Sequence, residues 1–462
     1  MVDSVTSVFD ELVAAGPPDA GTPLFDTACV LGGSVAGLLA ARVLSDHARR
    51  VVVVERDNLD GAVAIRAGVP QVQQVHALVP AGLQWIERWL PGFTQDAQDK
   101  GAVLGAPAQV LITHDGSYRP SGSVAHSLLT AGRPFLEARL REAVTALPNV
   151  SVLRARVAGL EYRDDAVSAV RYVGDEPGVL AADFVVDAMG RGSRLAKWLE
   201  QDGFDKPAVE RLQSPINYAT ALFERPERAV DLEVSTALGT FTPQYGADGV
   251  SIATVSAVED EQWIVMLVGF GEDRPGATTD EFRKVCAGMP QIWREATKGA
   301  VTRDVVTYRQ ADSRRRDFVG ANRLPARLVA VGDAVASFNP IYGQGMSSAA
   351  LHASCLSRYL VGGHRFDSPA TAFFDLQQVV VDAAWAVSAG GDTARLDALN
   401  GTDVPEDVRR RRWALEQIMT AAMSDSTVAQ AFNNVSFMLR HPDTLADPAL
   451  LERAVAVIKR QL

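Results

Sequence analysis

Residues 27–37 read TACVLGGSVAG, four valines follow at 51–54, and a glutamate stands at 55. The apolar run 27–31 predicts a short buried strand, residues 38–44 predict a helix, and the valines predict a second buried strand. Gly32 permits a tight turn and Gly37 permits close packing of the helix on the strand, while Ser34 replaces the second glycine of the GxGxxG pattern. The stretch therefore predicts a βαβ unit that binds a dinucleotide pyrophosphate at the helix N-terminus.

The acid at the end of the second strand narrows the choice of dinucleotide. A carboxylate at this position, here Glu55, accepts hydrogen bonds from ribose hydroxyls and favours FAD or NAD over NADP. The alternative interpretation of the motif is a tight strand-to-helix turn without a ligand.

Composition and charge exclude several classes of protein. The chain has 462 residues, of which 47% are apolar and 22% charged, as in a globular protein of two or three structural units. A net charge of −11 lacks the basic footprint that nucleic acid requires, and no apolar run predicts an integral membrane segment. Three widely spaced cysteines form neither a disulfide framework nor a metal-binding pair, which predicts a cytoplasmic protein without a metal site.

A second motif lies three hundred residues further on. Residues 329–334 read VAVGDA, residues 339–346 read NPIYGQGM, and a helix-forming run follows at 347–360. This arrangement resembles the para-hydroxybenzoate hydroxylase-like flavoprotein monooxygenases. The resemblance implies that Asp333 holds the ribityl hydroxyls of FAD and that Pro340 packs near the isoalloxazine. It also implies that the backbone amides of residues 343–346 face flavin N1 and O2, where a helix N-terminus stabilises the negative charge of reduced flavin.

Further segments extend the resemblance to about residues 27–390. Arg133 resembles the family arginine that contacts FAD; the alternative for it is an ion pair at a helix start. Residues 68–71 (GVPQ), 76–78 (HAL) and 186–194 (VDAMGRGSR) resemble a bacterial subgroup that includes polyether-antibiotic epoxidases. Two departures stand out: Met189 replaces the aspartate of an Asp-Gly pair linked to FAD and NAD(P)H, and residues 72–74 read VQQ where the subgroup usually has Gly-Arg-His.

The predicted fold is α/β, with a Rossmann-like FAD-binding domain, an inserted mixed-sheet substrate lobe and a helical C-terminal part. The predicted boundaries are 1–23 for a loose leader, 24–200 with 305–360 for the FAD-binding domain, 201–304 for the lobe and 361–462 for a helical cap. The predicted cofactor-binding residues are Gly32, Gly33, Ser34, Ala36, Gly37, Glu55, Arg56, Arg133, Val157, Gly332, Asp333, Pro340, Gly343, Gln344, Gly345 and Met346.

The resemblance implies an FAD-dependent monooxygenase of specialised metabolism. Such an enzyme inserts one oxygen atom of O2, through a flavin C4a-hydroperoxide, into a small and largely apolar substrate by epoxidation or hydroxylation. Electrons would come from NAD(P)H bound at the flavin face or from a partner reductase. The alternatives are a dehydrogenase or alkene reductase of the geranylgeranyl-reductase type, and a non-enzymatic flavin- or lipid-binding protein.

No catalytic side chain is predicted. Epoxidation needs no base, whereas hydroxylation of a phenol benefits from one, and the candidates for such a base are His114, His126, Tyr218, Tyr245 and Tyr308. The Trp-x-Trp-x-Ile-Pro signature of flavin halogenases is missing, and the spacing of Trp85 and Trp89 instead predicts two core residues of one helix.

Overall fold

A five-stranded parallel sheet forms the first layer of the protein. The computed structural model describes residues 4–19, 21–58, 70–76, 78–225, 233–243, 245 and 249–461. The sheet has the order β17-β11-β1-β2-β7, and every neighbouring pair is parallel. Its strands are β1 (Phe25–Leu31), β2 (Ala48–Glu55), β7 (Val150–Arg154), β11 (Phe184–Asp187) and β17 (Leu328–Ala330). The Rossmann-like parallel sheet predicted from the apolar runs is confirmed.

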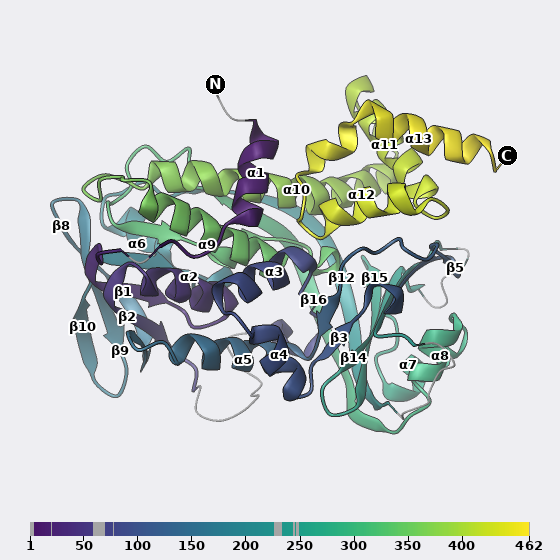
Figure 1. Cartoon of the computed structure of the whole chain (residues 1–462), viewed down its shortest axis with the longest axis horizontal. Coiled ribbons are helices and arrows are strands. Elements are labelled where there is room, and N and C mark those ends of the chain that lie inside the picture. Colours follow the sequence, from purple (N-terminus) through teal and green to yellow (C-terminus); the bar gives the residue numbers. More distant parts are fainter. Residues whose placement is uncertain are drawn as a thin grey trace.

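Helices cover this sheet (Figure 1). Helix α2 (Val35–Ser45) follows β1 directly and packs on β1 and β2, and α5 (Arg133–Thr145) and α9 (Gly345–Val361) pack against α2. A small antiparallel sheet of β8 (Arg156–Arg163), β9 (Ala166–Val173) and β10 (Pro177–Ala181) packs near β2 and β11. Most apolar residues of α2 and all those of β11 are buried, so that one continuous core holds these layers together.

An eight-stranded mixed sheet forms the second half of the molecule. Its order is β18-β16-β12-β15-β14-β13-β4-β5, with β13 and β4 parallel and the other neighbours antiparallel. Its strands are β4 (Val110–His114), β5 (Ser117–Tyr118), β12 (Ala208–Glu224), β13 (Thr236–Thr240), β14 (Ile252–Val258), β15 (Gln262–Phe270), β16 (Val301–Asp317) and β18 (Ala336–Ser337). A second core lies between one face of this sheet and helices α7 (Thr279–Ala287) and α8 (Gln291–Ala296).

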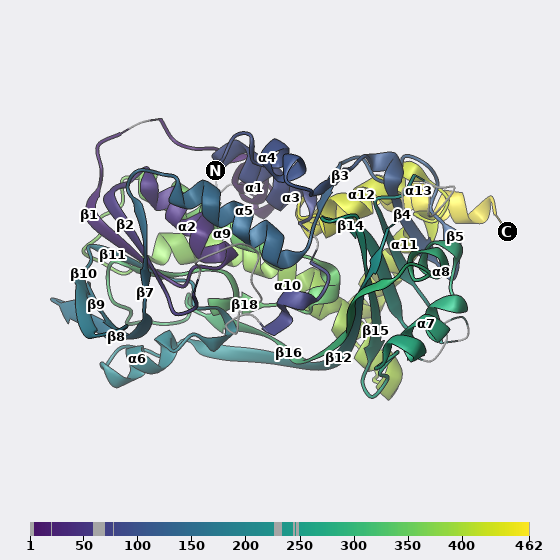
Figure 2. The same cartoon turned by 90° about the horizontal axis from the view of Figure 1, so that it is seen from below.

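Two strands run through both halves. β12 and β16 have 17 residues each and pair along almost their whole length, from Ala208 opposite Asp317 to Phe223 opposite Val301. Figure 2 shows this ribbon leaving the region of the parallel sheet and entering the mixed sheet. Near its C-terminal end β16 also pairs with β18, which follows β17 closely in the chain.

The C-terminal part is helical, as predicted. Helix α10 (Thr371–Asn400) packs on α9, whereas α11 (Glu406–Ala421), α12 (Ser426–Ser436) and α13 (Pro448–Lys459) form a small core of their own. The remaining elements are α3 (Pro80–Trp89), α4 (Phe93–Asp99), α6 (Leu195–Gln201), β3 (Val103–Gly105) and β6 (Leu128–Thr130). Trp85 and Trp89 stack at 4.8 Å in the core, which confirms their predicted role. Among the described residues, no helix combines the length and the hydropathy that crossing a bilayer requires.

The predicted loose leader is wrong for residues 5–14. Helix α1 (Val5–Ala14) occupies this stretch, and Phe9 and Leu12 are each only 1% exposed. Ser4 caps the helix by accepting a hydrogen bond from the Ser7 amide at 3.2 Å. The prediction failed because it weighed the glycines and prolines of residues 16–23 and overlooked the helical spacing of the apolar residues before them.

Candidate functional site

The turn between β1 and α2 leaves no room for a side chain at Gly32 or at Gly37. Gly32 has φ of +108°, and a Cβ there would lie 2.6 Å from the carbonyl oxygen of Ala188. A Cβ on Gly37 would lie 1.8 Å from the carbonyl oxygen of Gly32. Ser34 is the N-cap of α2, yet its side chain makes no capping hydrogen bond. The Ser34 side chain therefore does not occupy the first backbone N–H groups of α2, and these groups can bind an anion at the helix N-terminus.

Glu55 lies beside this turn. Its carboxylate is buried, with Oε2 accepting from the Gly33 amide at 2.7 Å and Oε1 accepting from the Asp57 amide at 2.9 Å. These two bonds fix an acid at the end of β2, next to the start of α2. Arg56 differs, because its side chain is exposed and its Nε lies 3.9 Å from an Asp57 carboxylate oxygen.

Arg133 reaches the same place from the start of α5. One of its terminal nitrogens donates to Ser34 Oγ at 3.2 Å and to Glu137 Oε2 at 3.3 Å. Ser34 Oγ itself donates to Glu137 Oε2 at 2.7 Å. The ion-pair interpretation of Arg133 is confirmed, and the side chain also lies against the N-terminus of α2, whereas its contact with FAD stays a prediction. Since Arg133 is 8% exposed, this cation is held within the protein.

The second motif packs directly on the first. Gly332 has φ of +60°, and a Cβ there would lie 2.5 Å from the Cβ of Ala36 on α2. Its amide donates to Nδ1 of His352 at 2.9 Å, and His352 is fully buried on α9. Burial raises the pKa of Asp333, although nearby arginines, Arg191, Arg133 and Arg314 in decreasing order, partly oppose that rise. The Gly-Asp turn is therefore placed close to the residues around Ser34.

The loop before α9 opens toward the same region. Asn339 caps a short turn (Pro340–Tyr342) by accepting from the Ile341 amide at 3.3 Å, and Gly343 follows in the left-handed conformation. Gln344 is the N-cap residue of α9, and its buried Oε1 has no hydrogen-bond partner among the described residues. A Cβ on Gly345 would meet nothing within 4 Å, so that open space lies beside the helix N-terminus.

The side chains of three other predicted cofactor-binding residues lie at the surface of the loop or in the main core. Pro340 is exposed at the loop, Met346 is buried in the main core, and Val157 is buried in the same core on β8. Gly68, Val69 and Ala77, which belong to the segments that resemble the epoxidase subgroup, lie outside the described residues.

The segment with Met189 holds a buried acid of its own. Asp187 accepts hydrogen bonds from the Met189 amide at 3.0 Å and from the Ser193 hydroxyl, and burial raises its pKa to about 6. The Met189 side chain packs against the main core. Arg191 forms an ion pair with Asp312 at 2.6 Å, which fixes this cation near Asp333.

The mixed sheet turns a largely apolar face toward the loop of residues 339–346. Across β12, β15, β14 and β13, strand register defines three rows of uncharged residues on this face: Tyr218–Val268–Ile252–Thr240, Thr220–Met266–Thr254–Leu238 and Leu222–Ile264–Ser256–Thr236. Arg303 of β16 lies beside Leu222 at the end of the third row, and its guanidinium donates to the Gln73 carbonyl at 2.7 Å. Ile341 of the loop packs against a small apolar cluster that includes Tyr218, Met266 and Val268. The loop therefore meets this face of the sheet through an apolar contact.

Of the five candidate bases, two lie together on this face. Tyr218 is 3% exposed, and its ring centroid lies 6.1 Å from that of Tyr308 on the neighbouring strand. Burial raises the pKa of Tyr218 well above its usual value, so that the phenol keeps its proton. His114 and Tyr245 are exposed, and His126 is half-buried.

Helix α10 contributes a buried acid that the sequence did not reveal. Both carboxylate oxygens of Asp392 accept from Asn339 Nδ2, at 3.1 and 3.0 Å, while Asn339 Oδ1 accepts from the Tyr218 hydroxyl at 3.3 Å. Asp392 and Asn339 are 1% and 2% exposed. This chain of hydrogen bonds joins the cap, the loop and the mixed sheet, and it fixes the position of the loop.

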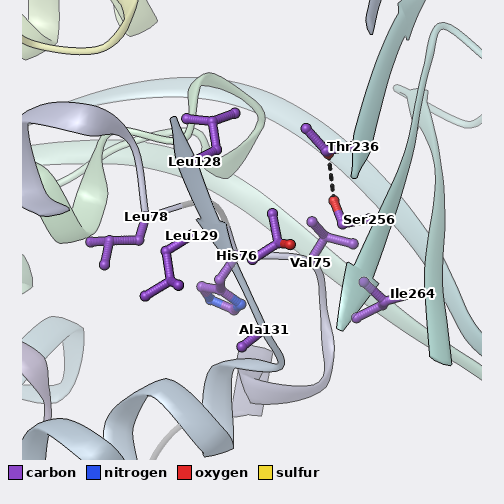
Figure 3. Close-up of a pocket in the computed structure, with 10 residues that line it drawn as sticks. Val75, His76, Leu78, Leu128, Leu129, Ala131, Thr236, Ser256 and Ile264 are labelled. Carbon is purple, nitrogen blue, oxygen red and sulfur yellow. Dashed lines mark hydrogen bonds between the residues drawn. The ribbon is translucent and has the colours of Figure 1, made fainter. Parts of the chain in front are cut away.

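A pocket lies between the N-terminus of α5 and the mixed sheet (Figure 3). His76 projects into it, the Thr236 and Ser256 hydroxyls are bonded to each other at its edge, and the other walls are mainly apolar. The pKa of His76 falls to about 3, chiefly because of burial and secondarily because of Arg133, so that the ring is neutral.

The described residues fit FAD. The N-terminus of α2, with a cation beside it, suits a pyrophosphate, and Glu55 is placed to meet a ribose. The unpartnered Gln344 oxygen and the open space at Gly345 suit a large polar group lying along the loop.

Comparison with known proteins decides the family. A family model described as an FAD binding domain matches residues 26–363. The chain belongs to this family. FAD is its cofactor, and the resemblance to para-hydroxybenzoate hydroxylase-like flavoproteins is confirmed at the level of the family, whereas the epoxidase subgroup stays a prediction.

Relatives of this FAD-binding protein cover nearly its whole length. It is 31% identical to Protein Rv3254 of Mycobacterium tuberculosis over 450 residues, 93% of each chain. p-Nitrophenol 4-monooxygenase PnpA from Pseudomonas putida has a similar fold, with a TM-score of 0.61 and 18% identity over 90% of this chain and 99% of that one. The flavin-dependent brominase Bmp2 has a TM-score of 0.62 and 13% identity over 95% of this chain and all of the other.

Proposed function

We propose that this FAD-binding protein is a monooxygenase that inserts one oxygen atom of O2, by epoxidation or hydroxylation, into a small, uncharged and largely apolar natural-product-like molecule. One observation carries the proposal: the loop of residues 339–346 meets the mixed sheet at an apolar cluster that includes Tyr218, Met266 and Val268, and the rows of β12, β15, β14 and β13 on that face bear no charged side chain. The cation Arg303 of β16 lies beside Leu222, two rows away from Tyr218, and its guanidinium donates to the Gln73 carbonyl. An anionic substrate would need a cation there, because burial of an unpaired charge is costly.

The predicted cofactor contacts form part of the proposal. The first turn of α2 with Arg133 would bind the pyrophosphate, Glu55 a ribose, and Asp333 the ribityl chain. The amides of residues 343–346, at the N-terminus of α9, would lie against the flavin ring. FAD, when bound, supplies the activation of O2 and the transfer of one oxygen atom.

The side chains of this protein position the substrate and exclude water. Tyr218, Met266 and Val268 form an apolar wall opposite the loop, and the hydrogen bond from Tyr218 to Asn339 fixes wall and loop relative to each other. Tyr218 keeps its proton and His76 stays neutral, so that neither is a strong base. This supports reactions in which the electrophilic oxygen meets an electron-rich π system and no side chain must first remove a proton.

The electron donor is proposed to be NAD(P)H at the flavin face or a separate reductase. Met189 packs into the core, and its segment presents the cation Arg191 paired with Asp312 instead of an exposed acid. An assay that supplies NADH, NADPH or a flavin reductase to the oxidised protein, with flavin bleaching as the readout, distinguishes the three donors.

The test of the function is oxygen transfer. The FAD-loaded protein is reduced without oxygen, mixed with ¹⁸O2 in the presence of aryl alkenes and phenols, and monitored by flavin absorbance and product mass. We expect one ¹⁸O atom in the product. Substrate reduction or dehydrogenation without ¹⁸O would identify the dehydrogenase or alkene reductase instead, and ligand binding without turnover over the whole panel would identify a non-enzymatic binding protein.

A further inference from the structure

We propose that the pocket around His76 recognises an uncharged hydrogen-bond donor, a hydroxyl or an amide N–H, at one end of the substrate. The proposal rests on the proposed function, because it assigns the orientation of the molecule that is oxygenated. The polar side chains of the pocket already donate their protons to other groups of the protein.

His76 offers an acceptor to the pocket. Its Nδ1 lies 2.9 Å from the carbonyl oxygen of Gln74, and since a carbonyl only accepts, Nδ1 carries the proton. The neutral ring then leaves Nε2 without a proton, as a pure acceptor. The charged groups that act on this ring are Arg133 and Glu137, which are paired with each other at 3.3 Å; the cation has the larger effect and favours the neutral ring.

The hydroxyl groups of the pocket are also left as acceptors. Thr236 Oγ1 donates its proton to the Val255 carbonyl at 3.0 Å, and the 2.7 Å bond between Thr236 and Ser256 must therefore use the Ser256 proton. Thr130 donates to the Ala257 carbonyl at 2.6 Å. The polar side chains that line this pocket among the described residues thus present lone pairs only. A ligand that brings a proton is complementary to them, whereas a ligand that brings another lone pair is not.

Size and walls define which part of the substrate fits. The cavity volume is about 40 Å³, which by this measure holds about three water-sized groups. Six apolar residues complete the lining: Val75, Leu78, Leu128, Leu129, Ala131 and Ile264. None of the described residues that line the pocket is charged, so that an ammonium group would meet no counter-charge among them. The pocket therefore takes a neutral end group.

The pocket continues into the proposed substrate space. Val75 lines the pocket and also packs against the apolar cluster around Tyr218, and Ile264 is two residues from Met266 on the same face of β15. A substrate anchored at His76 would extend along this face toward Ile341 and the flavin loop. The donor group and the oxygenated carbon then lie at opposite ends of the molecule.

The experiment uses the FAD-loaded full chain and a pair of probes, 4-vinylphenol and its methyl ether, 4-methoxystyrene. The two share the aryl alkene, but only the phenol donates a hydrogen bond. 4-Methylstyrene, which has as many non-hydrogen atoms as the phenol and no donor, controls for the extra methyl group of the ether. Dissociation constants come from the change in flavin absorbance during titration. We expect the phenol to bind at least about ten-fold more tightly, because a site of unpaired acceptors rejects an analogue that lacks the donor.

Two variants locate the preference. His76→Phe retains the ring but removes the acceptor, and it should abolish the preference, whereas His76→Gln keeps an acceptor oxygen and should retain part of it. FAD content of each variant controls for folding. The proposal is overturned if the wild type shows no preference, if the preference survives in His76→Phe, or if 4-vinylphenol causes no spectral change. The ¹⁸O assay fails or succeeds independently of this binding test.

Discussion

Acidification should weaken the fold through His352, the buried histidine that accepts from the Gly332 amide. Burial lowers the pKa of His352 from 6.5 to about 3, so the unfolded chain takes up a proton well before the folded one as the pH falls. The stability that depends on the neutral ring is present above the unfolded pKa and is lost as the pH falls toward the folded pKa. Between about pH 7.5 and about pH 5.5, this single group should lower the free energy of unfolding by about 1.4 kcal/mol.

The measurement compares urea unfolding of the wild type and His352→Asn at the two pH values. The asparagine Oδ1 can accept from the Gly332 amide near the place of Nδ1, but it does not titrate. The loss of stability on acidification should therefore be smaller in His352→Asn by about 1.4 kcal/mol. If both proteins lose the same free energy, His352 is not held neutral by burial and the reasoning is refuted.

Three further predictions concern the cofactor site. Gly37→Ala would place a Cβ 1.8 Å from a carbonyl oxygen of the preceding turn, so it should lower the free energy of unfolding by about 3 kcal/mol and prevent FAD loading. Gly192→Ala is the control, because its Cβ would meet nothing within 4 Å, and it should change neither quantity. Urea unfolding and the flavin content of the purified proteins measure the two effects. Gly345→Ala should leave the apoprotein at least as stable as the wild type but weaken FAD binding at least about ten-fold in a fluorescence titration, since its methyl group enters the open space at the helix N-terminus. Asp392→Ala should lower the free energy of unfolding by about 1–3 kcal/mol, because it leaves the buried Asn339 amide without its acceptor, and a loss no larger than that of Asp392→Asn would contradict this.

Periodic patterns predicted the fold where apolar runs are continuous. The strand 27–31, the valines 51–54 and the helix after Gly345 lie where the sequence predicted them, because each buries a whole face or the whole of a short strand. Parallel pairing of β4 with β13 joins residues more than a hundred positions apart, and no local pattern encodes it. Helix α1 was missed although its apolar residues recur at helical spacing, because the stretch that follows it is rich in glycine and proline and was given more weight.

The residues of the candidate site likewise fall into those that a sequence motif predicted and those that no local pattern encodes. The glycines, Glu55 and Arg133 were found from motifs, and the structure brings Ser34 and Arg133 into contact across 99 residues. His352 and Asp392 carry no motif, since each is a single polar residue on a helix whose partner lies elsewhere in the chain. The only signal for them in the sequence is a polar residue within an otherwise apolar helical stretch, and many surface positions share that signal.

The ribbon of β12 and β16 has a consequence for how the protein works. At about 3.3 Å per residue, 17 residues extend about 55 Å, so the same two strands belong to the surroundings of the Gly-Asp turn and to the wall opposite the flavin loop. Two lobes built on one hydrogen-bonded ladder can move relative to each other only by bending it. The register of the ladder shifts between Gln213 and Ile216 and again on either side of Leu222, and such irregularities are where a ribbon bends most easily. Any movement of one lobe against the other should therefore be concentrated at these positions, while the paired stretches between them move as rigid segments.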